Sequence, residues 1–317
     1  MPDPPDVTVS IVNHGNRDAV LRSLEALRDD DGRRSQLEVV VVDNASEDGS
    51  VDAVRAAHPG VRVVANAHRL GFGANHNRAV AAAHGRHLLL LNDDTVVPAG
   101  TIDRLVAYLD RHAHVGVVAP RVVDATGATH DSAWALPSVG VDLLQAATLH
   151  RLPAPQSRGV VARRVGWAMG CCLLVRASAF RAAAGFDEGF YMYSEEIDLC
   201  ARLAAAGWET HWLPSAAVVH EGQRSTGAAS PERAVEMARS RRRYWRRHLP
   251  AAAVLPVRLA VTAEFLALAA AAAVARRPWR PFLRQARGCW TDAGRPGLRE
   301  RAWAWNAVHA DAPGRAP

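Results

Sequence analysis

The first part of the chain alternates short apolar runs with stretches whose apolar residues recur at helical spacing. Four of the runs are too short for helices, and each suits a strand buried on both faces. They are Val7–Val12, Leu37–Val42, Val61–Ala65 and His87–Leu91. A fifth run, Val115–Ala119, has the same character. Strands that alternate with helices predict a mostly parallel sheet covered by helices on both faces.

Polar residues follow the predicted strands. They are Asn13, Asp43 with Asn44, Asn66, and Asn92 with Asp93 and Asp94. Open α/β sheets bind ligands at the carboxyl ends of their strands, so these side chains are expected around one crevice. Crowded carboxylates need a cation between them, and their hard oxygens suit Mg²⁺ or Mn²⁺. Taken alone, the triplet 92–94 is better explained as a polar turn, because Asn and Asp are common turn formers.

Gly71 and Gly73 follow the third predicted strand, with Asn75 close behind. A dinucleotide fingerprint would need a third glycine at position 76, which is a histidine, and it would follow the first strand. The glycines fit a tight turn into a helix. They fit equally well a close approach of the backbone to a ligand phosphate at the start of that helix.

Composition excludes several kinds of chemistry. The 317 residues are 49% hydrophobic and 22% charged, which is ordinary for a globular protein. Every cation is Arg, because the chain contains no Lys, and this excludes a lysine Schiff base, PLP attachment and a P-loop lysine. The four cysteines lack CxxC spacing, so neither a zinc site nor a disulfide framework is indicated.

The formal charge of +6 is unevenly distributed. Residues 221–317 hold 18 Arg against 7 acids, whereas residues 1–220 hold 20 Arg against 25 acids. A basic tail of this kind suits anionic lipid or phosphate surfaces. The first six residues lack the basic and apolar segments of a signal peptide, and the body is therefore expected in the cytosol.

Residues 226–310 are expected to form a helical, basic and amphipathic extension, followed by a disordered tail at 311–317. Within it, the segment 239–248 combines six Arg with two aromatic residues. The apolar stretch 251–275 is interrupted by charges, and its longest uncharged piece has 11 residues. That piece is short of the roughly 20 residues needed to span a bilayer.

Beyond that stretch, Trp279, Leu283 and Trp290 recur at helical spacing among arginines. Basic amphipathic helices rich in Trp lie in the membrane interface, so an anionic membrane surface is one expected partner. Helices packed on the catalytic body with a solvated Arg face fit the pattern equally well. No nucleic-acid-binding signature accompanies the charge, and nucleic acid is not expected as a partner.

Five motifs occur in order: Val9–Asn13, Val39–Ser50, Asn66 with Gly71–Asn75, Leu90–Thr95 and Gly185–Leu203. Together they resemble the family 2 glycosyltransferases of the GT-A fold, close to the bacterial rhamnosyltransferase-like group. The resemblance covers roughly residues 7 to 225. It implies a catalytic domain at 1–225, with a nucleotide-sugar half at about 7–120 and an acceptor half at about 121–225. It also implies an inverting reaction with a nucleotide-diphosphate sugar and Mn²⁺ or Mg²⁺.

The resemblance assigns roles on the donor side. Asp43 is implied to contact the nucleobase, and Asp94 to bind the metal at one end of a DxD-like motif. His220, after the predicted strand 216–219, matches a position that completes the metal or diphosphate site, although a lone histidine there is more often structural. Arg224 is one candidate for additional positive charge. The implied donor residues are Asn13, Asp43, Asn44, Asn66, Gly71, Gly73, Asn75, Asn92 and Asp93, with Asp94 and His220 at the metal.

On the acceptor side, a helix is predicted from Glu195 to about Ala206. Acids in a first turn also suit the helix dipole, which is a structural explanation for them. The family pattern has Glu-Asp where this chain has Glu195-Glu196, and the resemblance implies that Glu196 is the general base. Glu195 and Asp198 complete the implied catalytic set. The loop before the helix can wall a sugar site, and its expected acceptor contacts are Asp187, Glu188 and Tyr191.

Two function classes follow. The first is an inverting glycosyltransferase at the inner membrane surface that uses dTDP-rhamnose or a UDP-sugar and acts on a polyprenyl-diphosphate-linked or other cell-envelope glycan. The irregular segment 121–165 is its expected acceptor loop. The second is a non-catalytic, membrane-peripheral protein that binds sugar nucleotides. This class stays open because Glu stands at position 196, where the family pattern has the catalytic Asp.

Overall fold

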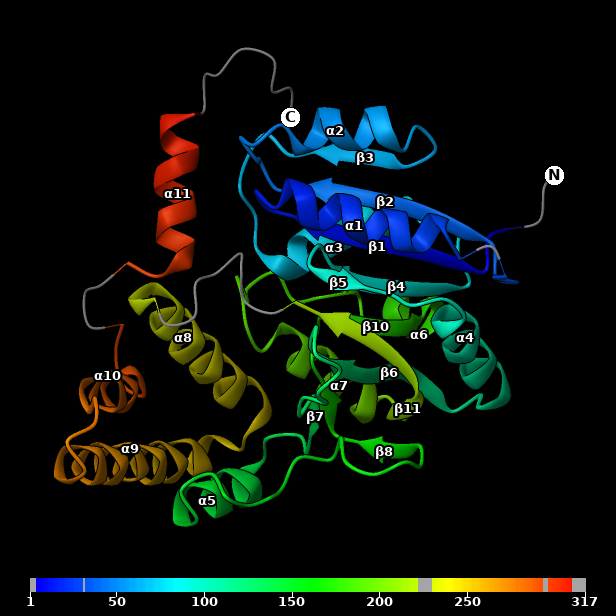
Figure 1. Ribbon diagram of the computed structural model, residues 1–317. Coiled ribbons are helices and arrows are strands. Elements are labelled where there is room, and N and C mark those ends of the chain that lie inside the picture. The colour runs from blue at the N-terminus through cyan, green and yellow to red at the C-terminus, as the bar shows by residue number, and fades with distance from the viewer. Residues whose placement is uncertain (1–3, 31, 222–229, 293–295, 310–317) are drawn as a thin grey trace.

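The computed structural model describes residues 4–30, 32–221, 230–292 and 296–309 (Figure 1). Its centre is a nine-stranded sheet in the order β3-β2-β1-β4-β10-β6-β11-β5, with β8 beside β11. The strands are β1 Val7–Asn13, β2 Leu37–Asp43, β3 Arg62–Ala65, β4 His87–Asn92, β5 Thr95–Val96, β6 Val115–Val123, β8 Arg163–Val165, β10 Cys172–Arg176 and β11 Glu209–His220. A separate pair is formed by β7 Ala133–Trp134 and β9 Trp167–Ala168.

The first four long strands form the parallel block that the hydrophobic pattern predicts. In register, Asn13 lies opposite Asp43, and Val12 lies opposite Asn92. Asp43 in turn lies opposite Ala65, the residue before Asn66. The polar residues that follow these strands therefore gather at one edge of the sheet, as expected.

The second half of the sheet is mixed rather than mostly parallel. β10 runs antiparallel between β4 and β6, whereas β6 and β11 are parallel to each other. β5 and β8 add antiparallel pairs to β11. A buried antiparallel strand is apolar on both faces, as a parallel one is, and hydrophobicity alone therefore does not reveal its direction.

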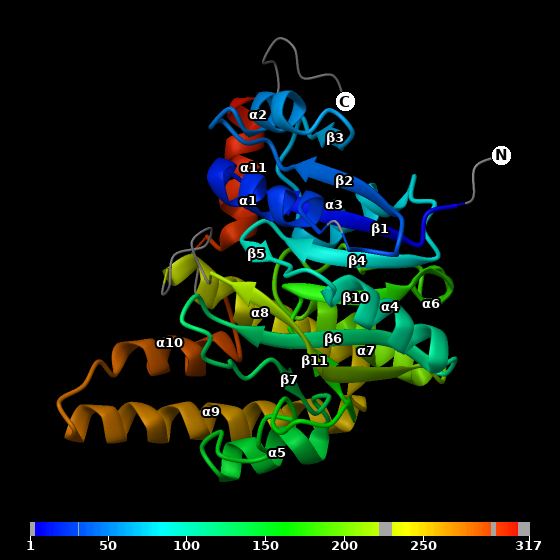
Figure 2. The same cartoon turned by 45° about the vertical axis from the view of Figure 1, so that its right-hand side comes forward.

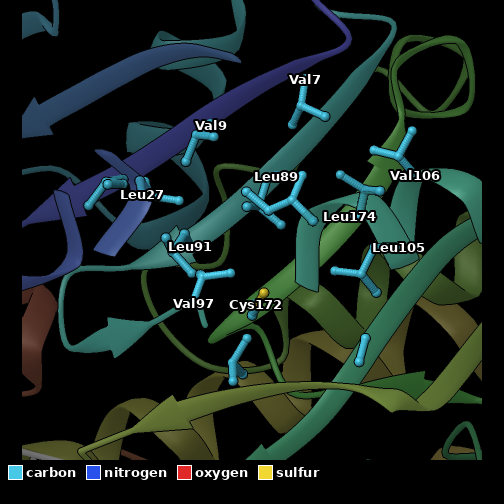
Figure 3. Close-up of a cluster of buried hydrophobic side chains, with 14 of the residues drawn as sticks. Val7, Val9, Leu27, Leu89, Leu91, Val97, Leu105, Val106, Cys172 and Leu174 are labelled. Carbon is cyan, nitrogen blue, oxygen red and sulfur yellow. The ribbon is translucent and has the colours of Figure 1, made fainter. Parts of the chain in front are cut away.

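Two cores cover the two faces of the sheet. Along β4, Leu89 and Leu91 point into one core (Figure 3), while Leu88 and Leu90 point into the other. This alternation is the period of two that a strand imposes on its side chains. The covering helices are α1 Arg17–Arg28, α2 Ser50–Ala57, α3 Phe72–Val80, α4 Thr101–Arg111, α6 Ala177–Ala182 and α7 Glu195–Ala205.

The C-terminal region packs on this body. It comprises α8 Pro231–His248, α9 Ala251–Val274, α10 Arg280–Gly288 and α11 Leu298–Val308. Tyr244 and Trp245 of α8 share an apolar cluster with Phe190 and, from α7, Ile197. α9 lies between α10 and α5, which spans Val139–Ala147 (Figure 2). α11 returns to the first half of the molecule, beside α2 and β3 (Figure 1).

The apolar stretch at 251–275 forms one helix, not interrupted pieces. α9 runs through Pro256, Arg258 and Glu264 for 24 residues. Among the described residues it is the single helix long and apolar enough to cross a membrane by length and composition, and 33% of its most apolar window is buried inside the protein. The charges that interrupt the stretch make contacts inside the protein: Arg258 donates to Cys289 O, and Glu264 bonds to His150.

Candidate active site

A cleft of about 1130 Å³ opens at the edge of the sheet where β1, β2 and β4 end. It extends from the first half of the molecule to the start of α7 and to helices α8 and α11. Nine of the residues that the sequence suggested line it: Asn44, Asn75, Asn92, Asp93, Asp94, Tyr191, Glu195, Glu196 and His220. The donor and acceptor halves of the sequence therefore share one cavity.

Asp94 and His220 meet at one wall of the cleft. The turn after β4 leads into β5, whose Thr95 pairs with His220 at the end of β11, so the two side chains are brought together. His220 Nε2 lies 3.2 Å from Asp94 Oδ1. Asp94 is buried, and its Oδ1 has no hydrogen-bond partner in the described part of the chain. A buried carboxylate oxygen without a donor, beside an imidazole, is a ligand pair that fits Mn²⁺ or Mg²⁺.

Asp93 shapes the neighbouring wall. Its Oδ2 accepts hydrogen bonds from the Asn16 amide at 3.1 Å and from His14 N at 3.3 Å, which tie the β1–α1 loop to the end of β4. Burial, and then the charge of Asp94, raise the pKa of Asp93 to about 7. At neutral pH, the Asp93 carboxyl therefore contributes less negative charge to the cleft than a fully ionised aspartate would.

Asparagine side chains hold in place the wall of the cleft next to the tip of β2. Asn44 Oδ1 accepts from Leu70 N at 2.7 Å, and its Nδ2 donates to Leu70 O at 3.0 Å. Asn75 Nδ2 donates to Gly71 O, and its Oδ1 accepts from Asn66 at 2.6 Å. These bonds fix the loop after β3 against the tip of β2.

Several predicted donor residues lie behind the cleft rather than in its lining. Asn13 is buried and donates to Asp43 Oδ2 at 2.8 Å, while Asp43 Oδ1 accepts from Ser46 N. Asn66 is also buried and holds Asn75. The structure assigns these three residues to the support of the cleft wall, and a direct contact of Asp43 with a nucleobase stays a prediction.

Gly71 and Gly73 also lie outside the lining. A Cβ on Gly71 would lie 2.5 Å from Tyr191 O, and one on Gly73 would lie 2.7 Å from the Cβ of Phe186. Both glycines therefore allow the start of α3 to pack against the loop 185–191. The close approach that they permit here is to the protein's own backbone and side chains.

The opposite wall is the start of α7. Glu195 is buried, Glu196 is half-buried, and the Oε2 atom of each has no hydrogen-bond partner among the described residues. Burial raises the pKa of Glu196 to about 7. Hydrogen bonds from backbone N–H groups, including that of Gly170, lower this pKa and partly offset the effect of burial. Burial and the charge of Glu196 raise the pKa of Glu195 well above its ordinary value. Tyr193 and Ser194, just before the helix, have φ of 68° and 67°, a strained conformation of the kind that collects at functional sites.

Cys171 connects the two walls. Burial raises the pKa of its thiol to about 12, with further contributions from the charge of Asp94 and, more weakly, of Glu196. Its carbonyl accepts from Asn92 N at 3.0 Å. The metal-binding candidates and the candidate base therefore lie around the same buried residue.

Asp198, Asp187 and Glu188 do not line the cleft. Asp198 is fully buried and holds His248 Nε2 at 2.7 Å and Arg202 Nε at 2.7 Å. Asp187 binds Arg243 and Arg247 of α8. Glu188 accepts from Asn77 at 3.0 Å. The geometry gives these acids structural partners, and of the implied catalytic and acceptor acids it leaves Glu195 and Glu196 facing the cleft. Arg224 lies outside the described residues.

The structure adds residues that the sequence did not single out. Trp134 and Trp167, from β7 and β9, stack at 4.7 Å and line one end of the cleft together with His130 and Met169. Their positions on two short strands far apart in sequence carry no local signal. The irregular composition of 121–165, where Trp134 lies, is the one hint that the sequence offers.

Helices α8 and α11 supply the other end. The lining residues there are Arg233, Met237, Leu298, Arg301, Ala302 and Trp305. Asn306 of α11 brackets the backbone of Arg69, accepting from its N at 2.7 Å and donating to its O at 3.1 Å. The Arg69 guanidinium lies 4.2 Å from the centre of the Trp305 ring. The C-terminal region therefore closes the end of the cleft beside the loop after β3, a role that its charge pattern did not suggest.

Comparison with known proteins agrees with this geometry. The family model for glycosyl transferase family 2 matches residues 8–182, more than half of the chain. The chain belongs to glycosyl transferase family 2. It is therefore an enzyme that transfers sugars, and the expected resemblance to rhamnosyltransferases is confirmed by its relatives.

One such relative is the N-acetylglucosaminyl-diphospho-decaprenol L-rhamnosyltransferase of Mycobacterium tuberculosis, 34% identical over 208 residues. The match covers 60% of this chain and 68% of the relative. A second is the rhamnosyltransferase WbbL of Escherichia coli K12, 28% identical over 223 residues, which cover 68% of this chain and 83% of the relative.

Solved structures confirm the GT-A fold of this glycosyltransferase. A mannosyltransferase from Pyrobaculum calidifontis, in complex with GDP-Man and Mn²⁺, superposes with a TM-score of 0.59 at 20% identity and covers 92% of this chain and 87% of that one. GalNAc-T7 with UDP, GalNAc and Mn²⁺ gives a TM-score of 0.56 at 16% identity, over 76% of this chain and 48% of that one.

Proposed function

We propose that this glycosyltransferase moves a sugar, with inversion, from a nucleotide-diphosphate donor to a hydroxyl of a diphosphate-lipid-linked glycan at the inner face of the membrane. dTDP-rhamnose is the donor we favour, ahead of a UDP-sugar, because the curated relatives are rhamnosyltransferases. The observation that carries the proposal is one cleft whose opposite walls hold the Asp94–His220 pair and the Glu195–Glu196 pair, with buried oxygens that lack hydrogen-bond partners in the described chain.

Asp94 and His220 are the residues that would hold Mn²⁺ or Mg²⁺. The ion supplies positive charge against the diphosphate leaving group as the sugar–phosphate bond breaks. The support is the chemistry of the pair. Asp94 Oδ1 is buried beside the imidazole nitrogen of His220, and it has no hydrogen-bond partner among the described residues. Asn44 and Asn75 fix the wall against which the nucleotide would lie.

Glu196 is the proposed general base. Its carboxylate takes the proton from the acceptor hydroxyl, whose oxygen bonds to the anomeric carbon while the bond from that carbon to the diphosphate oxygen breaks. Attack from the face opposite the leaving group inverts the anomeric centre. A carboxyl whose pKa burial has raised to about 7 is matched to accepting a proton at neutral pH.

The acceptor side follows from the far end of the cleft and from the relatives. The stacked rings of Trp134 and Trp167 offer flat apolar surface for sugar rings. The M. tuberculosis relative is named for a diphospho-decaprenol acceptor, which motivates a lipid-linked acceptor here. A substrate of that kind requires the enzyme to work at a membrane surface. The alternative of a non-catalytic binding protein is set aside, because the chain belongs to a family of enzymes and keeps a glutamate where a base is required.

The test is transfer of sugar from a panel of nucleotide sugars, with Mn²⁺ or Mg²⁺, to a short-chain polyprenyl-diphosphate N-acetylglucosamine. We expect turnover with dTDP-rhamnose and its loss with EDTA. A product that keeps the anomeric configuration of the donor would refute the inverting mechanism. Turnover unaffected by EDTA would refute the role of a metal. Activity with a different donor would correct the sugar but not the reaction.

A further inference from the structure

The outward face of α9 is built from apolar residues alone. Leu255, Leu259, Leu266 and Val274 recur on that face and are between 49% and 87% exposed. The alanines between them, Ala263 and Ala270, are exposed as well. Soluble helices show the opposite order, with charges outside and leucines inside. A row of exposed apolar side chains about five turns long, from Leu255 to Val274, marks an interaction surface.

The charged residues of α9 point into the protein. Arg258 donates to Cys289 O at 2.9 Å, and its guanidinium lies 4.4 Å from the centre of the Trp290 ring. Glu264 is buried and bonds to His150, in the turn that follows α5. The helix therefore keeps its polar groups satisfied on the inner side and exposes hydrocarbon on the outer side.

The neighbouring helices extend this surface. α5 and its following turn expose Leu143, Leu144, Leu149 and Leu152 on one side of α9, and the α10 region exposes Trp279, Leu283 and Trp290 on the other (Figure 2). Five exposed arginines accompany the apolar groups: Arg276, Arg277, Arg280, Arg284 and Arg287. The sole acid in α9 and α10 is the buried Glu264.

We infer that the outward face of α9, flanked by α5 and α10, docks on the surface of an anionic phospholipid bilayer. The leucines and tryptophans enter the boundary between headgroups and acyl chains, and the five arginines meet anionic headgroups. The inference rests on the proposed function in one respect: a lipid-linked acceptor gives such docking a purpose. α8 joins the two sites, because its first turns line the cleft and its last residue is three positions before α9.

The arginine cluster at 239–248, which the sequence suggested as a basic surface, is not the membrane contact. Arg243 and Arg247 hold Asp187, Arg239 and Arg242 hold Asp292, and Arg241 lies against the rings of Trp245 and Phe265. These cations attach α8 to the body. Arg246 and Arg247 are exposed on α8, but the larger group of exposed cations, five arginines, lies on α10 and the turn before it.

A bilayer fits this face better than a second copy of the chain does. Two copies joined through α9 and α10 would bring ten exposed arginines to one interface, and neither helix offers an exposed acid to pair with them. A spanning orientation fits less well, because α9 is held along its inner side by α5 and α10, and the three arginines of α10 would have to enter the hydrocarbon with it.

The test is flotation of the full chain with vesicles of phosphatidylethanolamine and phosphatidylglycerol, compared with vesicles of phosphatidylcholine alone. We expect the anionic vesicles to carry the protein. The triple variant L255D/L259D/L266D should reduce the bound fraction at least ~10-fold. The matched control is V160D/V161D, two exposed apolar residues in the loop before β8, which should leave flotation unchanged.

A second variant guards against misfolding. R276Q/R277Q/R280Q changes exposed charges without inserting acids, and it should lower binding to anionic vesicles to the level seen with 0.5 M NaCl. Both variants should keep Mn²⁺-dependent hydrolysis of the donor in solution, since neither touches the cleft. If the parent chain did not hydrolyse the donor, that result would count against the proposed function and would leave the flotation result standing.

Four results would overturn the docking surface. They are failure of the parent chain to float, flotation unchanged by the triple variant, retention in the membrane after alkaline carbonate extraction, and a vesicle-free dimer that the triple variant dissociates. The third result would mean that α9 spans the membrane. The fourth would mean that its outward face is a contact between protein copies.

Discussion

Two groups of buried acids in this molecule differ in what surrounds them. Outside the cleft, the buried Asp198 and the half-buried Asp187 lie beside cations: His248 and Arg202 for Asp198, and Arg243 at 2.8 Å for Asp187. In the cleft, Asp94, Glu195 and Glu196 have carboxylate oxygens without hydrogen-bond partners in the described chain.

Their pKa values differ accordingly. Burial pushes the pKa of Asp198 up, but hydrogen bonds from His248 and Arg202 more than offset it and hold that pKa below its usual range. For Glu196, burial dominates and raises the pKa to about 7. In the part of the chain that the structure describes, no arginine forms a salt bridge with these three carboxylates. A buried acid without such a partner marks a site where a ligand supplies the missing charge or proton.

The largest effect is expected at Asp94. Asp94→Asn should reduce sugar transfer and donor hydrolysis by at least ~10³-fold. The metal would lose its carboxylate ligand, and the negative charge of the diphosphate leaving group would no longer be neutralised. It should also abolish the thermal shift that Mn²⁺ and a nucleoside diphosphate cause together. Asp52→Asn, an exposed position on α2, is the control and should behave as the parent. Full activity of Asp94→Asn would show that the cleft acids are not a metal site.

Glu196→Gln is expected to lower kcat by about 10²- to 10⁴-fold, since the amide cannot take the acceptor proton. Donor affinity, measured by titration with the nucleoside diphosphate and Mn²⁺, should change little. Glu188→Gln makes the same chemical change on the loop before α7, outside the cleft lining, and should keep its rate. If Glu196→Gln remained fully active, Glu195 would become the candidate base.

Asp198→Asn should act on stability rather than on chemistry. Removing the buried charge leaves Arg202 and His248 without their anion, at a cost of about 3–5 kcal/mol in the free energy of unfolding. Because the pKa of Asp198 is lowered by folding, its contribution is present above its unfolded pKa of about 3.9 and is lost as the pH falls through the folded value. Urea denaturation at pH 7 and in acid measures both. A large loss of kcat at 10 °C, with the fold intact, would contradict the structural role.

The pH dependence separates the two groups further. A general base acts in its deprotonated form, so a pKa of about 7 at Glu196 predicts a kcat/KM that rises about tenfold per pH unit below 7 and levels off above it. The Asp198→Asn enzyme should show the same profile at a temperature where it is folded. A flat profile between pH 5 and 8, measured at saturating metal, would exclude Glu196 as the titrating base.

The smallest effect is expected where α11 closes the cleft. Trp305→Ala removes the ring beside the Arg69 guanidinium, an interaction of ~1 kcal/mol, and should raise the donor KM about fivefold with little change in kcat. Trp303→Ala, on the same helix and outside the cleft lining, is the control. Equal effects of the two substitutions would show that α11 matters for stability alone.

Much of the first half of the molecule could be predicted from sequence, because its signals are local. Each buried run of β1, β2 and β4 ends in its own polar residues, and parallel pairing places those residues at one edge whatever lies elsewhere. The start of α7 is equally local, since it combines acids in a first turn with a preceding loop rich in glycine and aromatic residues. That His220 belongs beside Asp94 was suggested by the family resemblance, and pairing between β5 and β11 brings the two together.

The sequence by itself determined which strands would form the first half of the sheet, where its acids and asparagines would gather, and which family the chain resembles. Only the tertiary structure decided which acids are paired. Asp198 and Glu196 are two positions apart on one helix, yet α8 covers the first with cations and leaves the second facing the cleft. It also decided that Arg258 and Glu264 turn inward on α9, and that Trp305 reaches Arg69 across more than 200 residues. These outcomes depend on contacts between distant segments, which no local pattern of hydrophobicity or charge encodes.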